Sequence, residues 1–401
     1  MQSKPRLFLF MPYIPYPVDR GTYQRVYNLL VELAKEFSID LACLQEERAR
    51  TMAPFESIVE RSIAIPFQNK PWAKLVPDRL LNPLPSTVAH WQDAGALESL
   101  KDFVKGQNYS IVQCIDLVLW PYMEALFPGH PCIVMDRSRV DWLFQTEELA
   151  TLQLGWKERL LRKENLWKIA RLEKTAYAGL RAMIVCGPDD LNFLNSCLSD
   201  TKKVFVLANG YNESYFDHVA FPQKLSKSPT VLFCGALDYS PNVDGIDWFA
   251  DKIWPRIHAS MPEVVWRIIG KSPDERSKRW GELEGVELVG EVEDVRPYYQ
   301  SAWLQVVPLR IGGGTRLKIV ESLGMDTPVV STTLGAQGLN LKNKEDILLA
   351  DSPEVFAQSV LTLLQDDVMR NSMQSKGYQA VQENYRWSTL GKKLSTFLNS
   401  L

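Results

Sequence analysis

The feature that most constrains the fold is a regular alternation of short apolar runs with segments of helical periodicity. The run at 7–10 (LFLF) is typical of a buried strand, and residues 22–36 repeat apolar side chains at the spacing of one helix face. Strand-like runs follow at 39–44, 111–115, 132–135, 183–186 and 204–207. Strands separated by helices predict a parallel sheet with helices on both faces.

The same alternation begins again in the second half of the chain. A helix is expected over 243–259, among strand-like runs at 231–237, 264–270, 286–292, 304–309, 328–332 and 346–350. Residues 211–230 are polar and rich in turn formers, which indicates a linker. We therefore expect an α/β protein of two Rossmann-like, doubly wound domains, over 1–212 and 228–385, that face each other across a cleft. Ligands of such sheets bind at the carboxyl ends of the strands, so the cleft is the expected site.

Composition narrows the class of protein. The chain has 401 residues, of which 46% are hydrophobic and 23% are charged, as in globular proteins with a sizeable core. Its net charge of -3 gives no reason to expect a nucleic-acid partner. The six cysteines form no Cys-x-x-Cys pair and are expected to be reduced, and no apolar run is long enough to span a membrane. We expect a cytoplasmic protein.

Metal ligands are not evident in the sequence. The four histidines (His90, His130, His218 and His258) are scattered without the spacing of a metal site, and the chain has no Asp-x-Asp motif. We therefore expect no metal ion and no bound cofactor, and expect protein cations to do what a metal ion does elsewhere.

The most informative segment is 308–332, where a strand ends, glycines follow and a helix begins. The glycines are Gly312, Gly313 and Gly314, and the helix is expected to open at about Thr315. Glycine allows backbone N–H groups to approach a ligand closely, and a helix N-terminus is a ready anion site. An ordinary glycine turn before a helix is the alternative interpretation.

Charged residues in this helix favour the ligand site. Arg316 and Lys318 place two cations in the first turn, on the face opposite the apolar residues of the helix. Glu321 lies one turn further along, where its carboxylate can accept hydrogen bonds from ribose hydroxyls.

This segment, GGGTRLKIVESLGMDTPVVST, resembles the donor-binding segment of the GT-B glycosyltransferases of the group 1 type, also called family 4. Nearly the whole chain shares the resemblance. Four further stretches agree in order and spacing: Arg20-Gly21-Thr22, 171–194 (RLEKTAYAGLRAMIVCGPDDLNFL), 207–216 (LANGYNESYF) and 231–249 (VLFCGALDYSPNVDGIDWF).

The resemblance implies a retaining transferase whose C-terminal domain holds a nucleotide-diphosphate sugar and whose N-terminal domain holds the acceptor. By position, Arg316 and Lys318 are implied to neutralise the diphosphate, and Glu321 matches the ribose-binding second glutamate of the family's Glu-x7-Glu pattern. The nucleotide base is implied to lie at the backbone around Gly290, Glu291 and Val292. Gly235, in the loop after the first strand of the C-terminal domain, is a further donor-binding candidate.

Two departures from the family pattern concern the donor. Gly313 stands where the family has the first glutamate, which helps to hold the donor sugar. The stretch after the first strand of the C-terminal domain, GALDYSPNVDG, lacks the arginine and lysine common there. Lys271, after the next strand, is a candidate for the missing charge, although a solvated lysine is an equally good interpretation.

The N-terminal domain offers fewer candidates. Gly21 is expected to let its loop approach the diphosphate, unless it only makes a tight turn. Asp136, Arg137 and Asp141 follow a strand end, and Asp136 is our candidate for orienting the acceptor hydroxyl. A structural aspartate that caps a helix is the alternative.

Two further segments, 155–174 and 386–401, are expected to form helices. Residues 155–174 carry seven Lys or Arg against three Glu, interleaved with Trp156, Leu160, Leu161, Leu166 and Trp167. Such a helix either lies on an anionic membrane, as a peripheral contact near a lipid-linked acceptor, or is a solvated helix of the N-terminal domain. The closing segment, 386–401, is expected to form an amphipathic helix that packs back on the N-terminal domain.

We conclude that the sequence predicts transfer of a sugar from a nucleotide-diphosphate donor to a glycan or lipid-linked acceptor, in exopolysaccharide or surface glycan synthesis. A sugar-nucleotide epimerase of similar fold and a catalytically silent sugar-nucleotide-binding module are the alternatives. A dehydrogenase is disfavoured because no Gly-x-Gly-x-x-Gly follows the first strand.

Overall fold

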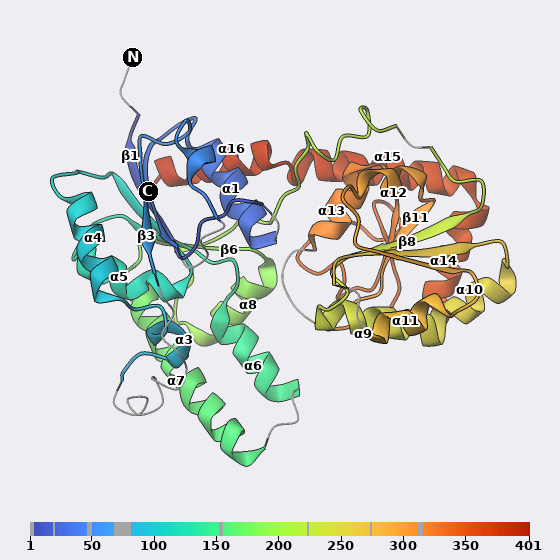
Figure 1. Cartoon of the computed structure of the whole chain (residues 1–401), viewed down its shortest axis with the longest axis horizontal. Helices are drawn as coiled ribbons and strands as arrows, with labels where there is room; N and C mark the ends of the chain where they lie inside the picture. Colours follow the sequence, from blue (N-terminus) through green and yellow to red (C-terminus); the bar gives the residue numbers. More distant parts are fainter. Residues whose placement is uncertain are drawn as a thin grey trace. The chain divides into compact units, whose positions relative to one another are not determined.

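The structure is a computed structural model that describes residues 4–18, 21–45, 50–67, 82–151, 155–222, 224–272, 275–311 and 316–401. It consists of two compact units (Figure 1). Residues 1–207 and 391–401 form one unit, the N-terminal domain, and residues 208–390 form the other, the C-terminal domain. The chain thus changes domain at 207/208, shortly before the expected linker at 211–230, and returns at 390/391.

The N-terminal domain is built on a sheet of seven parallel strands in the order β3-β2-β1-β4-β5-β6-β7. Strand order reverses direction between β1 and β4, which is the topological switch point of a doubly wound sheet. Most residues of the central strands are buried and apolar, as expected for strands covered on both faces. The strands are β1 (Arg6–Met11), β2 (Ser38–Gln45), β3 (Arg61–Pro66), β4 (Ile111–Ile115), β5 (Ile133–Asp136), β6 (Ala182–Val185) and β7 (Val204–Val206).

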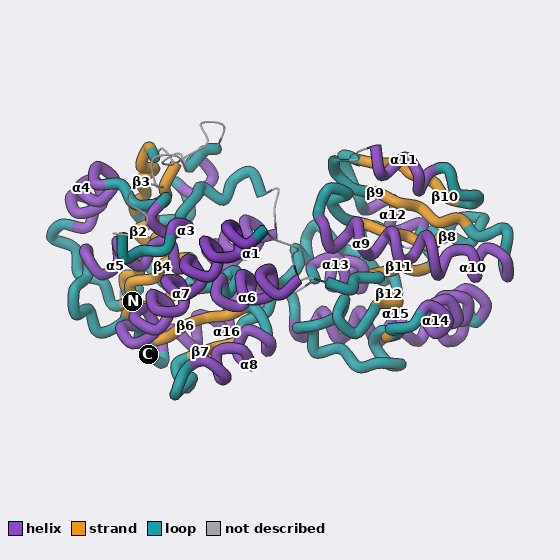
Figure 2. The backbone as a smooth tube through the Cα atoms, turned by 90° about the horizontal axis from the view of Figure 1, so that it is seen from below, coloured by secondary structure: helices purple, strands orange, loops and turns teal. Residues whose placement is uncertain are grey.

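Helices flank this sheet, and one of them comes from the end of the chain (Figure 2). Gly391 in the last helix is pressed against the first, since a Cβ atom at Gly391 would lie 2.2 Å from the Cβ of Glu32. Phe397 stacks on Phe205 of β7 with ring centroids 4.1 Å apart. The helices are α1 (Gly21–Leu33), α3 (Ser86–Ala89), α4 (Ala94–Val104), α5 (Trp120–Leu126), α6 (Asp141–Thr151), α7 (Trp156–Gly179), α8 (Pro188–Cys197) and α16 (Trp387–Asn399), with short 3-10 turns at η1 (Ala53–Phe55) and η2 (Leu117–Leu119).

The C-terminal domain repeats this architecture with six parallel strands in the order β10-β9-β8-β11-β12-β13. Its switch point lies between β8 and β11. The strands are β8 (Thr230–Cys234), β9 (Val265–Ile269), β10 (Val286–Gly290), β11 (Leu304–Val307), β12 (Val329–Ser331) and β13 (Leu348–Leu349). Two parallel sheets flanked by helices confirm the predicted fold class.

The helix expected over 243–259 is interrupted in the structure. It consists of α9 (Ser240–Trp248), the π-helical turn η3 (Phe249–Ile253) and α10 (Trp254–Ser260). Pro255 is the second residue of α10, which begins where the π turn ends. Because proline has no N–H to donate and its ring crowds the preceding turn, the hydrogen-bonding pattern of the helix changes there. The remaining helices are α11 (Glu275–Gly281), α12 (Arg296–Ser301), α13 (Leu317–Gly324), α14 (Pro353–Gln365) and α15 (Asp367–Asn384).

A buried ion pair ties α1 to the sheet of the N-terminal domain. The guanidinium of Arg25 donates to both carboxylate oxygens of Asp136, with Nη2 3.0 Å from Oδ1, and its Nη1 donates to the carbonyl of Leu207 at 2.9 Å. The Arg25 and Asp136 side chains are almost fully buried. Loss of one partner would leave the other charge buried without compensation.

We therefore predict that Asp136→Ala lowers the free energy of unfolding by about 3 to 5 kcal/mol, the usual cost of breaking a buried ion pair from one side. Urea denaturation followed by circular dichroism measures this change. Glu98→Ala, which removes an exposed pair with Lys101, is the matched control and is expected to change the transition little. Equal transitions for the two variants would show that the Arg25–Asp136 pair does not stabilise the domain.

Candidate functional site

The candidate site lies where α13 meets the carboxyl ends of β8 and β11, at the switch point of the C-terminal sheet. Connections leave β8 and β11 toward opposite sides of this point, which opens a crevice for a ligand in sheets of this kind. Gly235 follows β8 directly, and a Cβ atom built there would lie 2.6 Å from Nζ of Lys318. The glycine is therefore the residue that leaves room for the lysine head group.

Lys318 is held by neighbours from α9 and β8. Its ammonium donates to Oδ1 of Asn242 at 2.7 Å, and Nδ2 of Asn242 donates in turn to the carbonyl of Ala236 at 2.7 Å. Nζ also lies 4.5 Å from the centre of the Phe233 ring, close enough for a cation–π attraction. One amide and one aromatic ring thus fix the lysine at the end of the sheet.

Burial shifts the titration of Lys318 and Glu321 toward their neutral forms. The pKa of Lys318 is lowered to about 8, mainly by burial and also by the neighbouring Arg316, while Cys234 and Glu321 oppose the shift. Burial also raises the pKa of Glu321 to about 7, against the effect of Lys318. A positive charge that has lost much of its water interacts strongly with an arriving anion.

Arg316 stands immediately before α13, at its N-cap position. Only 8% of its surface is exposed, and burial lowers its pKa while an interaction with Tyr239 raises it. The first-turn N–H groups of a helix and its dipole add partial positive charge at the same place. Arg316, Lys318 and the start of α13 therefore concentrate positive charge at one point.

Three glycines pack the ends of neighbouring strands against each other beside this point. The N–H of Gly235 donates to Ile269 at 3.0 Å, and the N–H of Gly270 donates to Gly290 at 2.8 Å. A Cβ atom at Gly270 would lie 1.8 Å from the carbonyl oxygen of Gly235, so no other residue fits there. The ends of β8, β9 and β10 thus present backbone rather than side chains.

The remaining donor-binding candidates differ in how they are placed. Lys271 is exposed after Gly270, and its carbonyl accepts from the N–H of Leu237 at 2.8 Å. Glu291 is exposed, whereas Val292 packs against the apolar core of the C-terminal domain. The structure therefore brings Gly235, Lys318 and Asn242 together. Gly312, Gly313, Gly314 and Thr315 lie outside the described residues.

The N-terminal candidates require a correction. Gly21 is the exposed first residue of α1, and Arg20 lies outside the described residues. Asp136 was expected to face the cleft but is only 2% exposed and bound by Arg25. The reason is that the strand β5 extends through Asp136, so the side chain lies within the packed layer under α1. Its environment is that of a structural carboxylate.

Asp116 is a carboxylate that sequence reasoning missed. It follows β4 with a φ of 66°, and it accepts hydrogen bonds from the N–H and hydroxyl of Ser138 at 3.0 and 2.7 Å. Burial raises its pKa to about 6, with Arg137 acting in the opposite direction. The signal available in the sequence was its place directly after a strand, in CIDL.

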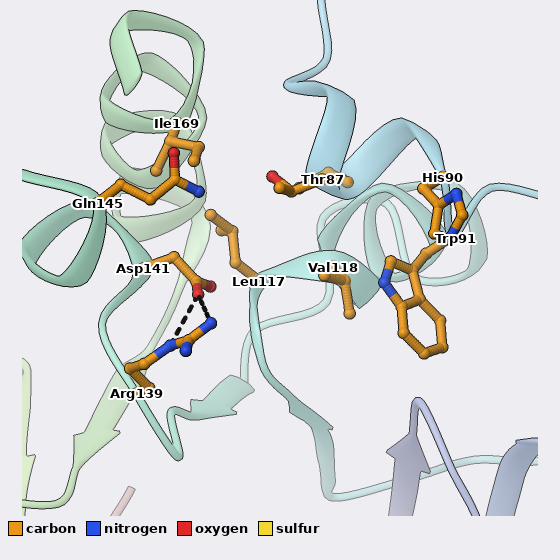
Figure 3. A pocket seen from close by; sticks show the side chains of 10 residues that line it. Thr87, His90, Trp91, Leu117, Val118, Arg139, Asp141, Gln145 and Ile169 are labelled. Carbon is orange, nitrogen blue, oxygen red and sulfur yellow. Dashed lines mark hydrogen bonds and ion pairs between the residues drawn. The ribbon is translucent and has the colours of Figure 1, made fainter. Parts of the chain in front are cut away.

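A cavity of about 290 Å³ lies in the N-terminal domain, and among the described residues Asp141 is the one N-terminal candidate from the sequence that lines it (Figure 3). Arg139 and Asp141 form an ion pair on one side of it, and Trp91 and His90 lie on the other. Its lining comes from α3, η2, α6, α7 and the residues after β5: Thr87, Val88, His90, Trp91, Leu117, Val118, Arg139, Asp141, Gln145 and Ile169. It combines aromatic and apolar surface with a few polar groups, as small-molecule sites do.

Known proteins resemble parts of this chain, and the C-terminal domain matches a family model. The model of the family described as "Glycosyl transferases group 1" matches residues 228–366. A 44.6 kDa protein of the cps region of Klebsiella pneumoniae is 23% identical over 163 residues, which are 39% of this chain and 42% of that protein. The glycosyltransferase 1 domain-containing protein 1 of Xenopus tropicalis is also 23% identical, over 39% of this chain and 46% of its own. The matches thus span less than half of either relative.

Solved structures extend the likeness to the whole chain. Sucrose-phosphate synthase of Thermosynechococcus elongatus superposes with a TM-score of 0.71 at 17% identity and covers 99% of each chain. HepE of Anabaena in complex with UDP-glucose has a TM-score of 0.66 at 12% identity, over 98% of this chain and all of its own. This protein therefore has the GT-B fold, and residues 228–366 of its C-terminal domain match the model of the group 1 glycosyltransferases.

Proposed function

We propose that this protein is a glycosyltransferase that moves a sugar from a nucleotide-diphosphate donor to a glycan or lipid-linked acceptor. The observation that carries the proposal is the pair of partly desolvated cations, Arg316 and Lys318, at the start of α13. They lie at the switch point of a domain that matches the group 1 family. A diphosphate, which carries negative charge on several oxygens, can pair with both cations at once.

The donor diphosphate would take the place of the water that Lys318 and Arg316 have lost. A phosphate oxygen at Nζ would compete with Oδ1 of Asn242, which now accepts from it at 2.7 Å. The N-terminal N–H groups of α13 can donate to the same anion. Backbone packing at Gly235 keeps the approach free of a Cβ atom.

Transfer of the sugar leaves a nucleoside diphosphate as the leaving group. When the bond from the sugar to the diphosphate oxygen breaks, that oxygen gains negative charge in the transition state. Two cations fixed by the fold stabilise this charge without having to reorganise, which is where electrostatic catalysis is largest. The family resemblance favours retention of configuration at the sugar.

Glu321 is suited to the ribose of the donor. It lies one turn after Lys318 on α13, and as a carboxylate it accepts hydrogen bonds from two neighbouring hydroxyls. Gly313 leaves the donor sugar without the first glutamate of the family pattern. The sugar is therefore expected to be held by other groups.

For the acceptor we propose the cavity of the N-terminal domain. Its lining includes Leu117 and Arg139, which follow β4 and β5, so it lies at the carboxyl ends of the strands, where ligands of such folds bind. A carboxylate and a guanidinium on one side of the cavity and an indole ring on the other suit the alternating polar and apolar faces of a sugar. The solved structure of HepE contains UDP-glucose, and one relative comes from a cps region. The first supports a nucleotide sugar as donor, and the second supports a surface glycan as product.

A catalytically silent binding module is the competing function, because of Gly313. A thermal-shift screen over nucleoside diphosphates and their sugars identifies the donor, since a ligand that binds only the folded state raises the melting temperature. Slow hydrolysis of that donor, or transfer to added acceptors, then separates an enzyme from a module. Binding without either reaction would favour the module.

We predict that Lys318→Met and Arg316→Ala each lower turnover by about 10²-fold or more, because each removes one of the two positive charges that stabilise the leaving group. Each variant should also lose most of the stabilisation by the donor in the thermal-shift assay. Lys376→Met changes an exposed lysine of α15 and is the matched control. Wild-type turnover in both site variants would show that the diphosphate binds elsewhere.

We predict that donor affinity falls as the pH rises through about 8, where Lys318 loses its proton in the free protein. The lowered pKa means that the ammonium is present below pH 8 and lost above it, so the dissociation constant should rise roughly tenfold between pH 7 and pH 9. Isothermal titration with a nucleotide sugar measures it. Lys318→Arg keeps its charge over this range and should remove the rise of the dissociation constant above pH 8. A wild-type affinity that is constant from pH 7 to 9 would contradict the assignment.

We predict that transfer continues in excess chelator. Arg316 and Lys318 supply the charge that a divalent ion provides in enzymes with an Asp-x-Asp motif, which this chain lacks. Turnover is measured with and without ethylenediaminetetraacetate after the donor has been identified. Complete loss of turnover that magnesium or manganese restores would overturn this prediction.

A further inference from the structure

The helix α7 presents an exposed stripe that neither the donor site nor the acceptor cavity uses. The stripe consists of Trp156, Leu160, Lys163, Trp167 and Arg171, which follow each other at steps of three or four residues. Residues at these steps lie on one face of a helix. Trp156 is 74% exposed, Leu160 62% and Trp167 61%, although large apolar side chains are normally covered in a folded domain.

The position of α7 leaves this face accessible within the N-terminal domain. Figure 1 shows α6 and α7 running side by side as a hairpin that projects from the seven-stranded sheet. The opposite face of α7 is the buried one, with Asn165, Ile169 and Glu173 among its covered residues. The helix thus packs on its domain through one side and shows the stripe on the other.

Cations dominate the exposed surface around the stripe. Each of the three carboxylates of α7 is engaged by a cation: Glu158 by Arg162, Glu164 by Lys168, and Glu173 by Arg137. Lys163 and Arg171 of the stripe are exposed, as are the neighbouring Lys157, Arg159 and Lys174. Arg171 lies over the ring of Trp167, 5.9 Å from its centre, and Lys157 lies over that of Trp156 at 5.4 Å.

Exposed tryptophans next to lysine and arginine are typical of protein surfaces that bind anionic membranes. Indole rings prefer the boundary between lipid headgroups and hydrocarbon, and lysine and arginine at the same depth attract anionic headgroups. A nucleic acid would use the cations but not Leu160, and a protein interface core is usually depleted of lysine. We propose that the α7 stripe binds the surface of a bilayer that contains anionic lipid, with α7 lying along that surface.

The proposal goes beyond the glycosyltransferase function and does not depend on it. The stripe spans about 22 Å along the helix, from Trp156 to Arg171 at 1.5 Å per residue. Two tryptophans and one leucine can therefore enter the headgroup region together while the cations contact headgroup phosphates. Interfacial helices bind in this way, through apolar area and electrostatic attraction combined.

Flotation of the full-length protein with vesicles tests the proposal. The protein should float with vesicles of phosphatidylcholine and phosphatidylglycerol, and should stay behind with vesicles of phosphatidylcholine alone. The double variants Trp156→Ser/Trp167→Ser and Lys163→Glu/Arg171→Glu should each lower the vesicle partition coefficient by about tenfold or more. Raising the salt concentration to about 1 M should weaken binding, because it screens the charges.

Two variants on α15 serve as matched controls. Val368→Ser removes an exposed apolar side chain, 82% exposed, and Lys376→Glu reverses an exposed charge. Both should float like the wild type. Because all substituted side chains are exposed, circular dichroism and melting temperature should stay unchanged in every variant. Equal flotation with neutral and anionic vesicles, no flotation with either, or wild-type flotation of both stripe variants would each overturn the proposal.

Discussion

The candidate donor site depends on the placement of the Lys318 ammonium at the carboxyl ends of β8 and β11. Strand order fixes this place, because connections on the two sides of the switch point diverge and leave the strand ends open. The fold then desolvates the ammonium between Phe233 and Asn242. One hydrogen-bond acceptor and one ring only partly compensate for lost water, and the lowered pKa of Lys318 expresses the remaining cost.

Burial also affects Glu321, where it disfavours the negatively charged carboxylate. Its pKa is raised, so both groups are drawn toward neutrality in the unliganded protein. An arriving diphosphate reverses this effect for Lys318, because a nearby anion favours the charged form. A bound diphosphate would therefore relieve part of the desolvation cost that the folded protein carries at Lys318. Sites of this kind are expected to lower stability while they raise affinity.

Much of the fold could be predicted from the sequence, because apolar runs and helical periodicity are local signals. The strand at 111–115 agrees residue for residue with β4. The strand β3 was missed: Arg61–Pro66 begins with a charge, ends with proline and is only partly buried at the edge of the sheet. The π turn was missed because Pro255 alters the helix without breaking its apolar pattern.

The candidate site was predictable only in part. Arg316, Lys318 and Glu321 are close in sequence, so their shared place on α13 follows from helix spacing. Asn242 and Gly270 belong to other elements, and only the folded chain brings them to Lys318 and Gly235. Asp136 shows the converse: its place at a strand end suggested an exposed carboxylate, but Arg25 of α1 lies over it. Contacts between distant elements leave no local signal in one sequence.

A crystal structure with a nucleoside diphosphate bound is the decisive test of the donor site. We expect diphosphate oxygens within about 3.2 Å of Nζ of Lys318 and of the guanidinium of Arg316, at the start of α13. We also expect the ribose hydroxyls to lie at the carboxylate of Glu321. A diphosphate bound in the C-terminal domain without contact to Lys318 or Arg316, or bound at another place in the chain, would contradict this assignment of the donor site.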